Sequence, residues 1–214
     1  MTDIHLDILD DVRKPVFLKL KACTPQGVLG GGTALALQLN HRKSYDFDIF
    51  VPKAISAQVY RNVSEVFQES PQKLVDSADQ LTVLLSSSVE LTFLYYWYQP
   101  LYPLIQTSGL PLYDKRDIAT DKAVTIGRRN VWRDYVDFYF LFHDKHITME
   151  QLCSDAEKRF GNEFSSKLFL AQLSYFADVK DQAIHLITSH DTKEDMQTYL
   201  QTLVTSYSKS YLSK

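Results

Sequence analysis

The chain has 214 residues and a formal net charge of −3, with 45% hydrophobic and 13% aromatic residues. That length fits one domain, or one domain with a helical extension, and the apolar content is sufficient for a substantial core, which excludes a disordered chain. The acidic balance excludes a protein that coats nucleic acid with a strongly basic surface, but it leaves room for a local basic site.

The cysteines and the hydropathy indicate a cytoplasmic protein. The two cysteines, Cys23 and Cys153, lie far apart without the spacing of a paired motif, so we expect reduced thiols. The N-terminus is acidic, unlike that of an ordinary signal peptide, and no apolar run approaches the ~20 residues that span a bilayer. We therefore expect a soluble cytoplasmic protein without a membrane-spanning segment.

The first elements lead to a cluster of glycines. Residues 3–22 show apolar side chains at helical spacing, and Pro15 is expected to kink or split this helix. A turn over 24–27 and a short strand at 28–29 follow. Four of the seven glycines fall between Gly27 and Gly32, at the entry to an apolar helix expected over residues 33–40. Glycines at a helix N-terminus let backbone N–H groups approach an anion closely.

A basic triplet and an acidic strand come next. The basic residues 41–43 fit a favourable position at the C-terminal end of the helix dipole, direct contact with a nucleotide, or both. On a strand, Asp46 and Asp48 point to one face, and Phe47 and Ile49 point to the other. Two adjacent carboxylates are oxygen ligands suited to Mg²⁺ that carries nucleotide phosphates. The sequence therefore predicts a phosphate cradle followed by a metal-binding strand.

Residues 56–102 are expected to form a helix, two strands and an aromatic connector. Ser56 can cap a helix that extends to Ser70, and strands over 81–85 and 89–95 read as a hairpin joined by three serines. Glu90 lies on the polar face of the second strand. The connector, residues 95–102, carries four tyrosines, Trp97 and Pro100. It fits either base stacking or packing on the core, so it stays unassigned.

From Asp117 onward the sequence is mostly helical. The helix expected over residues 132–142 is apolar on most of its surface, and its only charged residues are Arg133, Asp134 and Asp137. Burying charges costs free energy unless they are paired. We therefore expect these side chains to face one another, Lys122 on the preceding helix, or a polar cleft.

Three more helices are expected in the C-terminal part. The first and the last open with Thr148 and Thr192, each followed three residues later by a side chain that can complete a capping motif. The middle helix is expected over residues 163–177. The apolar stripes of these helices indicate packing surfaces.

Two groups of residues resemble the nucleotidyltransferase-fold toxins of the AbiEii/AbiGii type. The first signature of that family is Gly-Gly-(Thr/Ser), an apolar helix, His-Arg-x-Ser and Asp-x-Asp-(hydrophobic)-Phe. The second is a Lys, then an Arg, then (Lys/Arg)-Asp-x-x-Asp-(Leu/Phe) on consecutive helices. The matching positions here are Gly31, Gly32, Thr33, His41, Arg42, Ser44, Asp46, Asp48, Phe50, Lys122, Arg128, Arg133, Asp134, Asp137 and Phe138.

The resemblance implies an α/β (α+β) nucleotidyltransferase-like fold. A mixed sheet flanked by helices would occupy residues 1–113, and a helical subdomain over residues 114–214 would close the nucleotide cleft. The implied reaction moves an NMP from an NTP to an acceptor hydroxyl and releases pyrophosphate. The implied biological role is the toxin of a toxin–antitoxin pair that acts on RNA such as tRNA, with a DNA-binding antitoxin as its partner.

The same resemblance assigns roles to residues. Asp46 and Asp48 would hold Mg²⁺, and Glu90 would be a third metal ligand; an exposed strand glutamate is the alternative. Lys122 would contact phosphate and Asp137 would be an essential acid, whereas the alternative for both is a structural salt bridge between helices. The other nucleotide-binding residues would be Gly31, Gly32, Thr33, Arg42, Ser44 and Arg128.

Two other functions fit these residues. A small-molecule nucleotidyltransferase of the aminoglycoside-modifying kind would use the same metal site with an acceptor cleft lined by acids. A nucleotide-binding protein without activity would keep the fold, but the intact Asp46, Asp48 and Lys122 argue against it. The sequence identifies neither the NTP nor the acceptor.

Overall fold

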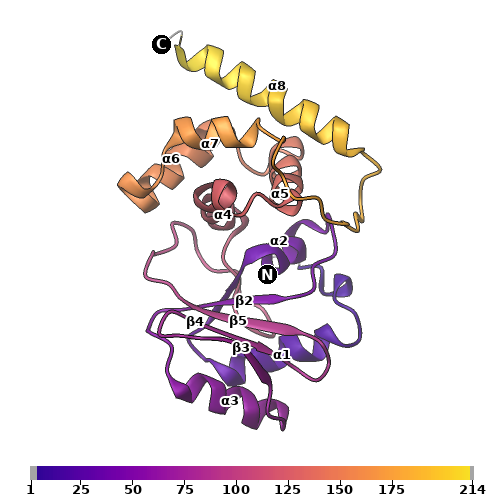
Figure 1. Ribbon diagram of the computed structural model, residues 1–214, viewed down its shortest axis with the longest axis vertical. Coiled ribbons are helices and arrows are strands. Elements are labelled where there is room, and N and C mark those ends of the chain that lie inside the picture. The colour runs from indigo at the N-terminus through magenta and orange to yellow at the C-terminus, as the bar shows by residue number, and fades with distance from the viewer. Residues whose placement is uncertain (1–3, 213–214) are drawn as a thin grey trace. The chain divides into compact units, whose positions relative to one another are not determined.

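The computed structural model describes the backbone of residues 4–212, and the chain divides into two compact units, Met1–Asp114 and Lys115–Lys214 (Figure 1). We call them unit 1 and unit 2. Residue 3, the expected start of the first helix, lies outside the described residues. Unit 1 contains the sheet, and unit 2 contains helices without a named strand in its described part.

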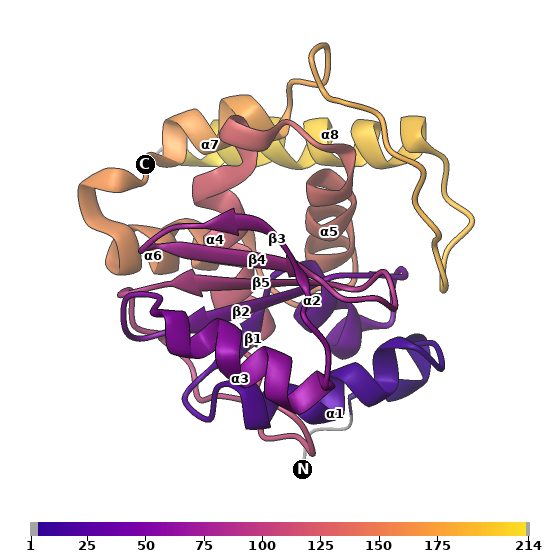
Figure 2. The ribbon, with the colours of Figure 1, turned by 60° about the horizontal axis from the view of Figure 1, so that its bottom comes forward.

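Unit 1 is built on a mixed five-stranded sheet in the order β1-β2-β5-β4-β3 (Figure 2). The strands are β1 (Val28–Gly30), β2 (Phe47–Val51), β3 (Gln72–Asp76), β4 (Gln80–Leu84) and β5 (Glu90–Tyr95). β2 and β5 are parallel, and the other neighbouring pairs are antiparallel. The predicted mixed sheet and the predicted β4–β5 hairpin are therefore confirmed.

β3 is the strand that the sequence did not predict. All five of its residues are exposed, including Leu74 and Val75, because β3 lies at an edge of the sheet. A strand without a buried face lacks the alternation by which strands are recognised. β3 carries an ion pair between Lys73 and Asp76, and its register is irregular between Lys73 and Val75. Charged side chains and irregular register hinder the pairing of an edge strand with other chains.

Three helices belong to unit 1: α1 (Arg13–Cys23), α2 (Gly31–Leu39) and α3 (Ala57–Phe67). The helical run expected over residues 3–22 is split, but the break falls before Pro15: a 3-10 turn, η1 (Leu6–Ile8), precedes α1, and residues 9–12 lie between them. Pro15 lies in the first turn of α1, where its missing N–H has no intrahelical acceptor to lose. α1 and α3 lie side by side along one face of the sheet (Figures 1 and 2).

The core of unit 1 confirms the predicted alternation on β2. Phe47 and Ile49 are fully buried, whereas Asp48 and Phe50 lie on the other face and are half-buried. Phe47 packs against Phe17 of α1, with ring centroids 6.3 Å apart. The buried face of β2 thus points toward α1, and the opposite face presents Asp48.

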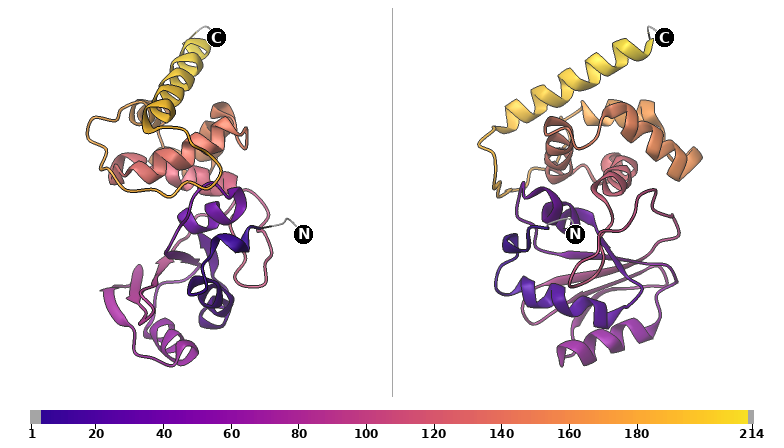
Figure 3. Two further views of the ribbon diagram at one scale, coloured as in Figure 1. Left: turned by 90° about the vertical axis from the view of Figure 1, so that its right-hand side faces the viewer. Right: turned by 180° about the vertical axis from the view of Figure 1, so that it is seen from behind.

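Unit 2 consists of α4 (Lys115–Arg129), α5 (Trp132–His143), α6 (Met149–Phe160), the 3-10 turn η2 (Gly161–Glu163), α7 (Ser166–Leu173) and α8 (Lys193–Leu212). The helix α7 is shorter than the predicted span of residues 163–177. α8 packs on α5 and α7 (Figure 3), and its buried residues are Met196, Leu200 and Val204. Among the helices of residues 4–212, none is both long and apolar enough to cross a membrane.

Both predicted helix caps of unit 2 are confirmed. The Gln151 N–H donates to Thr148 Oγ1 over 3.1 Å at the start of α6. Before α8 the bonds are reciprocal: the Asp195 N–H donates to Thr192 Oγ1 over 3.1 Å, and the Thr192 N–H donates to Asp195 Oδ2 over 3.0 Å. These bonds satisfy N–H groups that a helix cannot satisfy itself.

A buried arginine joins α6 to α4. The side chain of Arg159 is 1% exposed, and its Nη1 donates to the Asp117 carbonyl over 2.8 Å and to Thr120 Oγ1 over 2.9 Å. The same nitrogen lies 3.0 Å from Asp121 Oδ1. No local pattern predicts this cluster, because its members meet only when the two helices pack.

Candidate functional site

The chain passes directly from β1 into α2, and the first two residues of α2 are glycines. Neighbouring side chains leave no room for a Cβ at either position. Gly31 has a φ of +63°, a left-handed conformation that favours glycine, and a Cβ at this position would overlap Asp48 Oδ2. A Cβ on Gly32 would lie 2.7 Å from Nη2 of Arg42. A carboxylate and a guanidinium group therefore both border the first turn of α2, whose N–H groups favour an anion.

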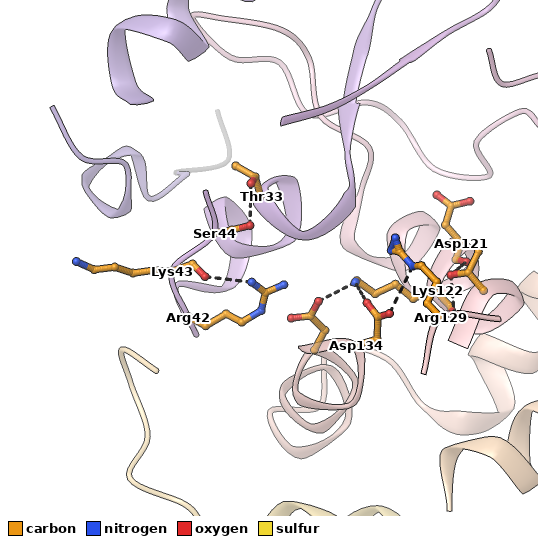
Figure 4. Close-up of polar contacts among 10 residues, drawn as sticks. Thr33, Arg42, Lys43, Ser44, Asp121, Lys122, Arg129 and Asp134 are labelled. Atoms are coloured by element: carbon orange, nitrogen blue, oxygen red, sulfur yellow. Dashed lines mark hydrogen bonds and ion pairs between the residues drawn. The ribbon is translucent and has the colours of Figure 1, made fainter. Parts of the chain in front are cut away.

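A hydroxyl pair fixes the segment that returns toward β2. Thr33 Oγ1 donates to the main-chain carbonyl of Asp46, and the hydroxyl of Ser44 is hydrogen-bonded to Thr33 Oγ1 at 2.8 Å (Figure 4). Thr33 is 1% exposed. The start of α2 and the residues before β2 are thus held together, which brings Gly32, Thr33 and Ser44 into one small region.

Arg42 lies against the start of α2 rather than its end. The helix ends at Leu39, and its C-cap residue Asn40 has a φ of +54°. The chain then returns so that the Arg42 guanidinium reaches Gly32. Nη1 of Arg42 donates to the Lys43 carbonyl over 3.0 Å (Figure 4), and Arg42 is 4% exposed. The interpretation that Arg42 serves the C-terminal dipole of α2 is therefore wrong; its contact with a nucleotide stays a prediction.

The two predicted metal-binding strands are neighbours. In the parallel pair of β2 and β5, Asp48 lies opposite Thr92, and Glu90 precedes Thr92 by two residues on the same face, with Oε1 3.5 Å from Thr92 Oγ1. Asp46 lies just before β2 and is exposed. The predicted position of Glu90 on a strand beside the Asp-x-Asp strand is thus confirmed.

Whether these carboxylates can hold a metal ion depends on how many protein ligands the ion requires. Within the described residues, no three or more His, Cys, Asp and Glu side chains gather in a group that could hold a metal ion. Mg²⁺ in nucleotide sites commonly uses one or two protein carboxylates and takes its other ligands from phosphates and water. Asp46 and Asp48 fit that smaller set, and Glu90 as a third ligand stays a prediction.

In unit 2, Lys122 lies between two carboxylates. Its Nζ is 2.7 Å from Asp134 Oδ1 and 2.7 Å from Asp137 Oδ2, and the three side chains are 6%, 1% and 0% exposed. Arg129 Nε lies 3.7 Å from Asp134 Oδ2, with its side chain 47% exposed (Figure 4). The salt bridge between helices, one of the two predicted roles, is present. Contact of Lys122 with phosphate and the essential acid at Asp137 stay predictions.

The other two basic positions of the second signature are more exposed. Arg128 lies in the last turn of α4 and lines a cavity of about 120 Å³ together with residues of η2 and α7. Gly127 lines the same cavity, and a Cβ there would overlap the Gln172 amide. Arg133 is half-buried on α5. A nucleotide contact by Arg128 stays a prediction.

Comparison with known proteins supports the fold. No protein-family model matches the chain. An uncharacterised protein of Aquifex aeolicus, aq_aa25, is 28% identical over 189 residues, which cover 84% of this chain and 86% of that protein.

Two solved structures from Helicobacter pylori share the architecture. One, provisionally named a nucleotidyltransferase, has a TM-score of 0.59 and 19% identity, covering 93% of this chain and 92% of that one. The other, JHP933, has a TM-score of 0.56 and 16% identity, covering 95% of each chain. The chain therefore has a nucleotidyltransferase-like fold, with a mixed α/β part followed by a helical part.

Proposed function

We propose that this protein is a Mg²⁺-dependent nucleotidyltransferase that moves an NMP from an NTP to an acceptor hydroxyl and releases pyrophosphate. The observation that carries the proposal is the first turn of α2, which Asp48 borders at Gly31 and Arg42 borders at Gly32. A metal–triphosphate has the complementary chemistry, because its cation needs carboxylate oxygens and its phosphates need N–H donors and cations.

The proposed roles in unit 1 follow from the chemistry of each group. Asp46 and Asp48 would hold Mg²⁺, which acts as a Lewis acid on the phosphate when bound. The triphosphate would be held by backbone N–H groups, two hydroxyls and one guanidinium group, from Gly31, Gly32, Thr33, Ser44 and Arg42. The hydrogen bonds of the Thr33–Ser44 pair and of the Asp46 carbonyl use both hydroxyl protons, so each hydroxyl would exchange its present acceptor for a phosphate oxygen when the anion binds.

In unit 2 the proposed roles rest on the family resemblance. Lys122 and Arg128 would balance the negative charge of the leaving pyrophosphate, as cations do in phosphoryl transfer generally. Asp137 would act as the essential acid through Lys122, because its Oδ2 lies 2.7 Å from the ammonium group. That contact would orient the lysine.

The acceptor and the biological role are also proposed from the resemblance. We take the acceptor to be RNA, with tRNA as the first molecule to test, and the protein to be the toxin of a toxin–antitoxin pair. An antitoxin would then be its protein partner.

The test is incubation with each labelled NTP, Mg²⁺ and total RNA, with Asp48→Asn as the inactive control. Label in RNA that depends on Asp48 is the expected result. Label in a small molecule would point to the aminoglycoside-type alternative. NTP binding without transfer to any acceptor would indicate a nucleotide-binding protein, and the absence of NTP binding would overturn the proposal.

A further inference from the structure

An exposed aromatic side chain lies next to the proposed phosphate cradle. Tyr45 is 47% exposed and stands between Ser44 and Asp46. Both neighbours are tied to Thr33, one through its hydroxyl and the other through its main-chain carbonyl. The backbone that carries Tyr45 is therefore fixed on both sides, although its ring extends to the surface.

The ring is also held in place from α1. The Arg13 guanidinium carbon lies 4.8 Å from the ring centroid of Tyr45, and Arg13 Nε donates to the Tyr45 carbonyl over 2.8 Å. Asp10 in turn forms an ion pair with Arg13 Nη1, and its Oδ1 accepts from the Arg13 N–H over 2.8 Å. Asp10, Arg13 and Tyr45 form a chain of contacts that orients one aromatic ring.

This arrangement differs from ordinary surface packing. The side chain of Arg13 is only 17% exposed, so the guanidinium group covers part of the ring while nearly half of the tyrosine stays in contact with solvent. An aromatic ring fixed in this way loses little conformational freedom when a flat ligand stacks on it. The flat groups that accompany a triphosphate are nucleobases, and their stacking on aromatic side chains tolerates any base.

We infer that Tyr45 forms a nucleobase subsite beside the phosphate cradle, and that Asp10 and Arg13 position its ring. This inference rests on the proposed function, because it assumes a nucleotide in the cradle. The Cα atoms of Ser44 and Tyr45 are about 3.8 Å apart, which limits the separation between the ring and the cradle to a distance that a single nucleotide can span. The base would come either from the NTP or from the end of the acceptor.

Binding measurements can separate the base from the phosphates. Calorimetric titration in Mg²⁺ would compare the four α,β-methylene NTPs with inorganic tripolyphosphate. If the NTP supplies the base, Tyr45→Ala should weaken NTP binding about tenfold and leave tripolyphosphate binding unchanged. Tyr45→Phe keeps the ring and should stay within about twofold of the parent.

A second arm covers the acceptor. If the acceptor supplies the base, NTP affinity should be unchanged in Tyr45→Ala, while the apparent KM for total RNA in the labelling assay rises about tenfold at constant kcat. Arg13→Lys keeps the charge but not the planar fork, so it should show a smaller loss of the same kind. It should add little in the Tyr45→Ala background, because the contact with the ring is then already lost and only the hydrogen bond to the main-chain carbonyl of residue 45 remains.

Each remaining outcome is decisive. Equal behaviour of Tyr45→Ala and Tyr45→Phe in both arms would overturn the subsite and leave the proposed function standing. An equal loss of NTP and tripolyphosphate binding in Tyr45→Ala would mean that the ring merely supports the cradle, which also overturns the subsite. A parent protein that binds tripolyphosphate but no NTP, or neither, would overturn the proposed function together with the subsite.

Discussion

The carboxylates of unit 1 and those of unit 2 lie in opposite environments. Asp46 is exposed and Asp48 is half-buried, whereas Asp134 and Asp137 are at most 1% exposed and both lie 2.7 Å from Lys122. A buried charge must be compensated within the protein, but a solvated carboxylate can exchange water for a metal ion. The comparison shows that the carboxylate of Asp46 is in contact with solvent, whereas the charges of Asp134 and Asp137 are compensated within the protein by Lys122.

The largest expected effect is on activity, from Asp48→Asn in unit 1. The amide keeps the shape of the side chain but is a poor ligand for Mg²⁺, whose contribution to phosphoryl transfer amounts to several kcal/mol. Transfer of labelled NMP should fall by orders of magnitude while the thermal melt stays close to that of the parent. Asp79→Asn, at an exposed position in the β3–β4 turn, is the matched control and should remain fully active. Full activity in Asp48→Asn would remove the metal assignment.

The next effect is on stability, from Lys122→Met in unit 2. The substitution leaves Asp134 and Asp137 buried without their shared cation, so the free energy of unfolding in urea should fall by about 3–5 kcal/mol. Arg129→Met is the control, because its side chain is 47% exposed and its loss should cost no more than about 1 kcal/mol. If Lys122→Met instead folds as stably as the parent, the buried salt bridge contributes no net stability and the comparison between the units fails. A loss of NTP affinity in the same variant would support the proposed phosphate contact of Lys122.

A smaller effect is expected for Asp46→Asn in melts with and without Mg²⁺. Repulsion between two solvated carboxylates amounts to roughly 1 kcal/mol, so in chelator the variant should melt at or slightly above the parent. It should also lose most of the stabilisation that millimolar Mg²⁺ gives the parent, because that stabilisation depends on metal affinity. The hydrogen bond from Thr33 ends on the main-chain carbonyl of Asp46 and is retained. A variant that is less stable in chelator and equally stabilised by Mg²⁺ would mean that the Asp46 side chain is structural.

The last prediction concerns the rate at which the single buried cysteine of each unit is modified. Burial raises the pKa of the Cys23 thiol to about 12 and also raises the pKa of Cys153. Only thiolate reacts, so iodoacetamide at pH 8 should modify either cysteine only after local opening. The rate should rise with pH as the opened thiol ionises near its ordinary pKa.

The modification rates of Cys23 and Cys153 report the local opening of unit 1 and of unit 2 separately. Lys122→Met should accelerate modification of Cys153 more than that of Cys23. Mg²⁺ with an α,β-methylene NTP should slow modification of Cys23 in the parent and not in Asp46→Asn. Mass spectrometry of the alkylated peptides would measure both rates, and equal acceleration at both cysteines would show that the two units open together.

The sequence predicted the parts of the fold that depend on local patterns. Alternation identified β2 and placed Phe47 and Ile49 in the core, and capping residues located the starts of α6 and α8. The edge strand β3 was not predicted, because an exposed strand lacks the alternation of apolar and polar residues by which strands are recognised. The extent of the first helix was misjudged because apolar spacing alone does not show where a proline falls within a turn.

For the candidate site, too, some features could be predicted from the sequence and others only from the tertiary structure. Residue types and spacing determined that glycines precede a helix and that two aspartates flank Phe47. Only the folded chain decided that Arg42 returns to Gly32, and that Arg13, 32 residues away, holds Tyr45. Periodicity reports which face a side chain occupies along one element, whereas the partner of a long charged side chain depends on how separate elements pack. For that reason the residue types of the candidate site could be predicted from the sequence, whereas the contacts that position them required the structure.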